Sequence, residues 1–174
     1  MLLRGMQLVI PCLRTDSGID LTARNIQEEA KKAGLPWTAA KGTVNSMELT
    51  IGYNSFLPLS EFIPKEKIPD PHNVRLQLQV NGNVVQDDNT NLMLYKIPDL
   101  FEAITDVMDL NRGDIILSKL SEFARADYLA GTPKGVGQVV NGDVMKASCF
   151  VGDDLIESFE VSCVDRKRAD GTQW

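Results

Sequence analysis

The chain has 174 residues, of which 43% are hydrophobic and 24% are charged, and its formal net charge is −6. This composition is typical of a single globular domain rather than of a disordered or fibrous chain. No apolar run approaches the length of a membrane-spanning helix, and the acidic balance argues against binding to phosphates, so we expect neither a membrane nor nucleic acid as a partner.

Two features bear on the cellular compartment. The first 14 residues carry two arginines and no acidic side chain, as transit segments do, although they are short and Pro11 would interrupt a helix. The three cysteines, Cys12, Cys149 and Cys163, lie far apart and form no CxxC pair. Their spacing argues against a zinc ribbon or a disulfide framework and favours reduced, packed thiols.

Two segments have the three- and four-residue apolar spacing of amphipathic helices. The first helix is predicted over residues 20–33, with Asp20 and Thr22 as candidate N-terminal caps. The second is predicted over residues 99–110, where Asp99 has the position of the first residue of a capping box.

The other elements are predicted to be strands. Residues 74–86 combine alternating apolar positions with Asn-Gly, the strongest short signal for a β-hairpin. Residues 115–117 and the stretch 137–164, which contains a second Asn-Gly pair, are also typical of strands. The segment 56–71 holds four prolines, so it is expected to cross a surface in extended form with local turns.

Four features could carry chemistry, and each has a structural alternative. Asp20 could be a ligand for Mg²⁺ or a simple helix cap. His72 is the only histidine and lies in a proline-rich turn, so it is expected to be a surface turn residue. The glycine-rich segment 131–137 lacks the spacing of a phosphate loop, which favours a tight turn. Lys41 could be a partly desolvated cation near a site or an ordinary surface lysine.

Five long motifs follow one another in the chain: DLTARNIQEEAKKAGLPWTAAKG, FLPLSEFIPKEKIPDP, VNGNVVQ, GDIIL and GTPKGVG. Together they resemble the fumarylacetoacetate hydrolase family, and in particular its branch of mitochondrial acylpyruvate hydrolases, oxaloacetate decarboxylases and oxaloacetate tautomerases. The resemblance implies an α+β, mainly β fold: a partial mixed β-sandwich roll with two short helices. It also implies a homodimer and a mitochondrial location, with the cytoplasm as the alternative.

The resemblance also divides the chain. Residues 1–18 form a non-family N-terminal segment, 19–166 a partial C-terminal-type domain of the family, and 167–174 a polar tail. Residues 43–55 and 118–130 interrupt the domain as insertions, and we expect both to be peripheral or poorly ordered.

The site residues are implied by the same motifs. In the family, Mg²⁺ or Mn²⁺ is held by two glutamates of an E-x-E motif and by one aspartate, which matches Asp20. Arg24 and Gln27 match residues that face the carboxylate and keto oxygens of the substrate. Lys41 matches a catalytic lysine beside the metal-bound substrate, and Thr132 matches a threonine that binds the substrate carboxylate.

The chemistry of a 2-oxo acid explains these residue types. Its carboxylate and keto oxygens can chelate a divalent cation, which then stabilises the enolate formed on C–C cleavage, decarboxylation or tautomerisation. The resemblance therefore predicts a metal-dependent enzyme for acylpyruvates or oxaloacetate. The chain nevertheless contains no E-x-E motif and no match to the lid His-x-x-Glu pair of the family. The alternative function is a non-catalytic form that acts by pairing with another subunit.

Overall fold

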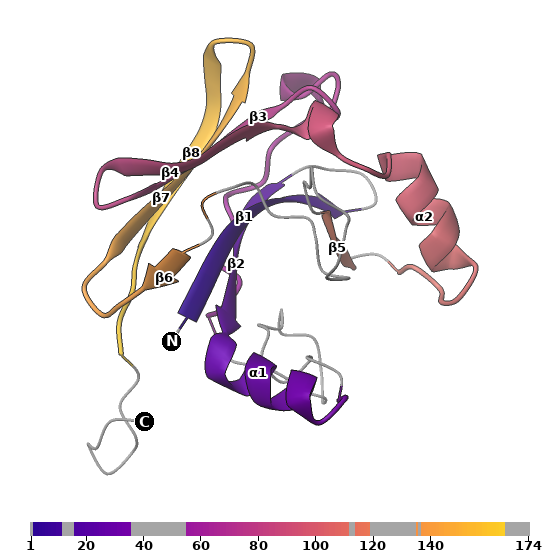
Figure 1. Ribbon diagram of the computed structural model, residues 1–174. Coiled ribbons are helices and arrows are strands. Elements are labelled where there is room, and N and C mark those ends of the chain that lie inside the picture. Colours follow the sequence, from indigo (N-terminus) through magenta and orange to yellow (C-terminus); the bar gives the residue numbers. More distant parts are fainter. Residues whose placement is uncertain are drawn as a thin grey trace.

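Two antiparallel β-sheets of four strands each build the fold of the computed structural model (Figure 1). The structure describes residues 2–11, 16–35, 55–111, 114–118, 135 and 137–165. Two α-helices and the short 3-10 helices η2 (Lys65–Lys67) and η3 (Thr90–Leu92) complete this described part. The mainly β fold with two helices is confirmed.

The first sheet is built around β1 (Leu2–Pro11). Strand β2 (Asp16–Ala23) pairs with most of its length on one side. On the other side, β5 (Ile115–Ser118) and β6 (Gly137–Val139) pair with opposite ends of β1. The strand predicted at residues 115–117 is thereby confirmed, and the N-terminal segment supplies the central strand of the sheet.

The outer edge of β2 is covered by the proline-rich segment. The backbone N–H of Ile19 donates to the carbonyl oxygen of Pro58 at 3.1 Å, and that of Leu21 donates to the carbonyl oxygen of Phe56 at 2.9 Å. Proline has no backbone N–H and cannot donate to a neighbouring strand. Pro58 contributes only its carbonyl oxygen as an acceptor, so it is tolerated at this edge. The extended course predicted for this segment is confirmed.

The second sheet has the strand order β4-β3-β7-β8, formed by β3 (Arg75–Val80), β4 (Asn83–Asn89), β7 (Val144–Val151) and β8 (Asp154–Ser162). The predicted hairpin is confirmed, since β3 and β4 pair directly. Asn81 and Gly82 at its turn have φ angles of 51° and 79°, the positive values that a two-residue hairpin turn requires.

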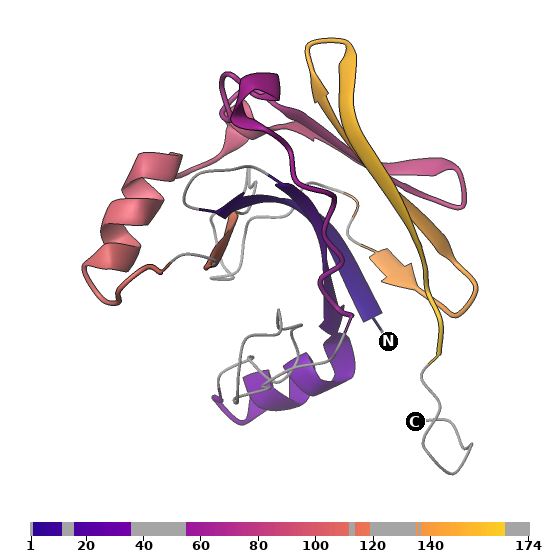
Figure 2. The same ribbon diagram turned by 180° about the vertical axis from the view of Figure 1, so that it is seen from behind.

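The core lies between one face of each sheet. Along β3 the buried residues alternate with half-buried glutamines, as a strand with one covered face requires. The core side chains come from both sheets and from the proline-rich segment, and include Ile19, Leu21, Ile63, Leu76, Leu78, Met145, Ala147 and Cys149. The helices lie at the margin of this core, α1 (Arg24–Lys32) beyond the end of β2 and α2 (Ile97–Thr105) to one side, where its first residue Ile97 reaches the core (Figure 2).

Helix α1 begins later than residue 20, and the prediction of Asp20 or Thr22 as its cap was wrong. Asp20 belongs to β2 and lies opposite Gly5 of β1, and the pairing continues to Ala23. Ala23, which has no side-chain hydrogen bond to the helix, is the N-cap. Pairing with the preceding strand β1 therefore overrides the helix signal at residues 20–23.

Helix α2 begins before the predicted residue 99 and ends well before residue 110. Asp99 lies inside the first turn, where its carboxylate accepts the backbone N–H of Lys96 at 3.1 Å. Val107 and Met108, which would extend the apolar stripe, are 79% and 59% exposed. Burial of these two side chains therefore does not extend the helix, although the backbone N–H of Met108 still donates to the carbonyl oxygen of Ile104 at 2.9 Å.

Nearly all of the two predicted insertions, and the tail 167–174, lie outside the described residues. The predicted domain boundaries, and a peripheral place for the insertions, stay predictions. In the described ranges, no helix is long and apolar enough to cross a membrane.

Candidate functional site

Strand β2 has two different buried faces. Ile19 and Leu21 point into the core between the sheets. Because side chains alternate along a strand, Asp20 and Thr22 belong to the opposite face. Asp20 is only 8% exposed and Thr22 only 5%. A buried polar face of β2 therefore leads directly into α1.

The first turn of α1 joins two of the predicted site residues. Arg24 Nη1 donates to Gln27 Oε1 at 2.8 Å, which is the contact that i and i+3 positions on one helix face allow. Gln27 is the one buried residue of α1, at 8% exposed. Since its amide oxygen faces the guanidinium, its amide nitrogen, a donor, points away from Arg24.

Glu28 holds the same guanidinium from a second direction. Its Oε1 lies 3.5 Å from Arg24 Nε, and the two side chains are 59% and 43% exposed. An exposed pair of this kind adds little to stability. A guanidinium has five N–H donors in a planar fork, so these two contacts leave Arg24 able to bind a carboxylate.

The described residues around Asp20 do not by themselves form a site for a tightly held divalent metal. The affinity of an oxygen site for Mg²⁺ or Mn²⁺ depends on how many charged oxygen ligands it offers. The neighbouring strand β1 contains no aspartate or glutamate, and Gly5 is the residue opposite Asp20. Within the described ranges, no group of three or more His, Cys, Asp or Glu side chains could hold a metal ion. Asp20 alone offers one carboxylate.

Lys41 and Thr132 lie outside the described residues, and their predicted roles stay predictions. One residue of the same glycine-rich segment is described. Gly135 has a φ of +96°, and a Cβ at this position would overlap the carbonyl oxygen of Val85 in β4. The positive φ of Gly135 is a conformation that glycine readily adopts in turns, and its backbone packs directly against the hairpin.

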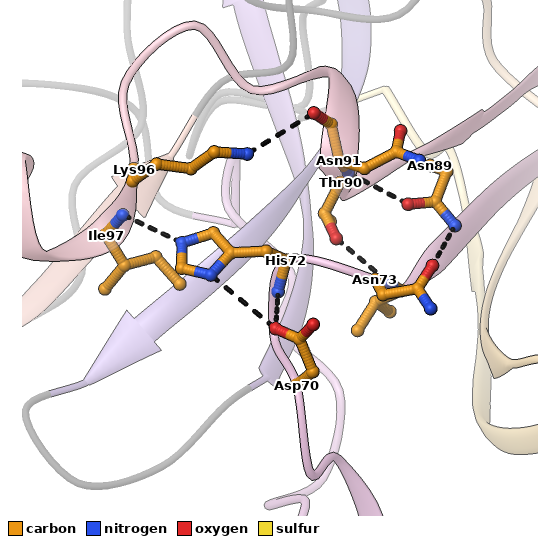
Figure 3. A network of polar contacts seen from close by, with 9 residues as sticks. Asp70, His72, Asn73, Asn89, Thr90, Asn91, Lys96 and Ile97 are labelled. Carbon is orange, nitrogen blue, oxygen red and sulfur yellow. Dashed lines mark hydrogen bonds and ion pairs between the residues drawn. The ribbon is translucent and has the colours of Figure 1, made fainter.

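Analysis of the sequence missed the contacts of His72, which Figure 3 shows between Asp70 and the start of α2. Its Nε2 accepts the backbone N–H of Ile97 at 3.0 Å, and its Nδ1 lies 3.6 Å from Asp70 Oδ1. His72 does lie in a turn, but its side chain is only 26% exposed. No local pattern could reveal this role, because the partner lies 25 residues away in the sequence.

The described cysteines are free thiols. Cys149 is fully buried in β7, and burial raises its pKa to about 12. Cys163 is half-buried, and burial raises its pKa as well. Packed, unpaired thiols are confirmed for these two, while Cys12 lies outside the described residues.

Comparison with known proteins places most of the chain in one family model, described as Fumarylacetoacetate (FAA) hydrolase C-terminal, which matches residues 17–158. The mitochondrial oxaloacetate tautomerase of Schizosaccharomyces pombe is 54% identical over 137 residues, 79% of this chain and 52% of that protein. The mitochondrial oxaloacetate decarboxylase of Dictyostelium discoideum is 39% identical over 150 residues, 86% of this chain and 57% of that protein. The chain thus spans about half the length of these curated relatives.

Solved structures have the same fold. The crystal structure of yeast ynq8, a fumarylacetoacetate hydrolase family protein, superposes with a TM-score of 0.78 at 28% identity, over 96% of this chain and 70% of that one. A fumarylpyruvate hydrolase from Pseudomonas aeruginosa, crystallised with Mn²⁺ and pyruvate, gives a TM-score of 0.72 at 20% identity, over 94% and 66%. At that identity the second likeness concerns the fold alone.

Proposed function

This chain belongs to the fumarylacetoacetate hydrolase family, and on that premise we propose that it binds a small 2-oxo acid of the oxaloacetate class in mitochondria. The names of its relatives, oxaloacetate tautomerase and oxaloacetate decarboxylase, both mitochondrial, support the ligand and the location. Acylpyruvates share the 2-oxo acid group and form the second candidate ligand class.

The observation that carries the proposal is the hydrogen bond of 2.8 Å between Arg24 and Gln27. This contact places the planar guanidinium of Arg24, which suits a carboxylate, beside the buried amide of Gln27, whose nitrogen can donate to a keto oxygen. These two groups match the two oxygens that a 2-oxo acid offers side by side. Lys41 and Thr132 remain predicted additional contacts.

Turnover is a separate question from binding. Only interactions that are stronger in the transition state than in the ground state accelerate a reaction. In an enolate-forming reaction, the interaction of this kind is a positive charge held beside the oxygen on which negative charge develops. Because the described donor set around Asp20 does not form a site for tightly bound Mg²⁺ or Mn²⁺, we propose weak binding, about 4 kcal/mol or a millimolar dissociation constant, with little or no turnover in the isolated chain.

Calorimetric titration of oxalate and oxaloacetate into the metal-free chain tests this proposal. We expect a millimolar dissociation constant that rises at least about tenfold in Arg24→Met, since a charge-assisted hydrogen bond is worth about 1.5–3 kcal/mol. The matched control is Lys32→Met, which removes one positive charge from the exposed last turn of the same helix. Equal weakening in both variants would mean that oxalate responds only to the general charge of α1, and would contradict a site at Arg24 and Gln27.

The second candidate function is a non-catalytic subunit that pairs with another chain of the family. Five exposed apolar side chains on either side of α2 favour this pairing function, because exposed apolar surfaces mark interaction sites. They are Leu92, Leu94, Tyr95, Val107 and Met108. Size-exclusion chromatography of this chain mixed with a full-length relative should then show a mixed species. Separate elution of the two chains at all concentrations would exclude this function.

A further inference from the structure

We propose that His72 is a pH-sensitive latch that holds the N-terminal end of α2. Its Nε2 accepts the backbone N–H of Ile97, the first residue of the helix, at 3.0 Å (Figure 3). The first N–H groups of a helix have no acceptor inside the helix, so an outside group must satisfy them. The next residue, Pro98, has no N–H. His72 therefore caps the leading donor of α2.

The attachment of α2 depends on this end. Ile97 is the one buried residue of the helix and belongs to the core between the sheets. Leu100 and Phe101 pack against the core from the next turn, whereas Glu102 and Thr105 are exposed. Loss of the hydrogen bond to the Ile97 N–H therefore affects the end of α2 that packs against the core.

Protonation of His72 turns the Nε2 atom from a hydrogen-bond acceptor into a donor. A nitrogen that accepts a hydrogen bond carries no proton, so the neutral ring has its proton on Nδ1, which faces Asp70 Oδ1. A proton added to Nε2 turns this atom into a donor that faces the N–H of Ile97. The hydrogen bond is lost, and the imidazolium lies against the positive end of the helix dipole.

The charged groups around the ring act in opposite directions. Asp70 favours the imidazolium, but its side chain is 64% exposed and therefore screened by solvent. From the start of α2, Lys96 adds positive charge, although its Nζ donates to the carbonyl oxygen of Asn91 at 3.4 Å. Asp99 accepts the backbone N–H of Lys96. Protonation thus keeps the Asp70 contact and breaks the one that holds the helix.

Nitrogen NMR and amide hydrogen exchange on the full chain test the latch. His72 is the only histidine, so all imidazole nitrogen signals come from this one residue. At about pH 7.5 we expect the Nδ1–H tautomer. At about pH 5.5, where the spectra should show a proton on Nε2, protection of the Ile97 amide should be about tenfold lower than at pH 7.5 after correction for intrinsic exchange.

Two controls make the result specific. The Val74 amide donates to the Thr90 hydroxyl at 2.8 Å, an acceptor that does not titrate here, so its protection should stay constant. His72→Gln supplies an acceptor at every pH and should remove the pH step, whereas His72→Phe should leave Ile97 poorly protected throughout. An Nε2–H tautomer in the neutral ring, or equal Ile97 protection at both pH values, overturns the latch. Both of these readings come from the wild-type chain and need neither variant.

Discussion

Substituting Gly135 by alanine tests how the glycine-rich segment packs on the hairpin. The φ of Gly135 is +96°, and a Cβ there would overlap the backbone carbonyl oxygen of Val85. Gly142 is the matched control, because its φ is +91° and a Cβ would meet nothing within 4 Å. The two positions therefore share the backbone strain and differ only in the steric overlap.

The magnitude follows from these two terms. Left-handed backbone costs an L-residue about 1–2 kcal/mol, and both variants incur that cost. Forcing an extra methyl group into a filled space costs about 1–3 kcal/mol more, and only Gly135→Ala incurs this second term because the obstacle is backbone rather than a movable side chain. We expect Gly135→Ala to lose about 2–5 kcal/mol of unfolding free energy. The control Gly142→Ala should lose about 1–2 kcal/mol.

Equilibrium unfolding in urea, followed by circular dichroism, measures both losses on one scale. An unchanged slope with denaturant would show that the variants differ in stability and not in the extent of unfolding. An equal loss in the two variants would refute the close packing of Gly135 on β4.

Three further predictions concern the surface and the thiols. The guanidinium of Arg75 donates to Asp87 and holds the pKa of that carboxyl below its ordinary value, so the stabilisation is present above about pH 4 and is lost as the pH falls through the lowered pKa. Asp87→Asn should remove this part of the acid sensitivity in thermal melts between about pH 2.5 and 6, and an unchanged acid profile would contradict the pairing. Under native conditions iodoacetamide should label Cys163 well before Cys149, whose burial raises its pKa to about 12, and equal labelling rates by mass spectrometry would disprove the difference. The exposed apolar side chains near α2 should make the protein self-associate as its concentration rises, whereas a monodisperse monomer by light scattering would count against this.

The second sheet could be predicted because its signals are local. An alternating run followed by Asn81-Gly82 specifies both the strand and its turn within a dozen residues. Asn141-Gly142, in contrast, marks the turn at which the chain passes from β6 in the first sheet to β7 in the second. The contact between Arg24 and Gln27 is also local, since three residues along a helix return to the same face.

The features that could not be predicted depend on partners that the local sequence pattern does not reveal. The sequence of Leu2–Pro11 has no helical period and no flanking turn signal that assigns it to the middle of a sheet. Because the sequence does not identify that strand, Asp20 has the pattern of a helix cap, whereas the structure places it opposite Gly5 in an antiparallel pair of strands. The capping of Ile97 by His72 joins two segments that share no local pattern.

The lack of the family's glutamate motif, in contrast, is visible in the sequence. An E-x-E motif occurs nowhere in the chain. The structure adds that the strand beside Asp20 carries no acidic residue, so no neighbouring carboxylate of that strand replaces the motif.

Activity assays of the isolated chain with excess Mg²⁺ or Mn²⁺ test most directly whether it binds a 2-oxo acid without turning it over. Oxaloacetate decarboxylation and acetylpyruvate cleavage should both stay at the level of Asp20→Ala, because one carboxylate does not hold the cation that would stabilise the enolate. Metal-dependent turnover near that of a complete family member, lost in Asp20→Ala, would contradict the proposal and establish the chain as an active enzyme.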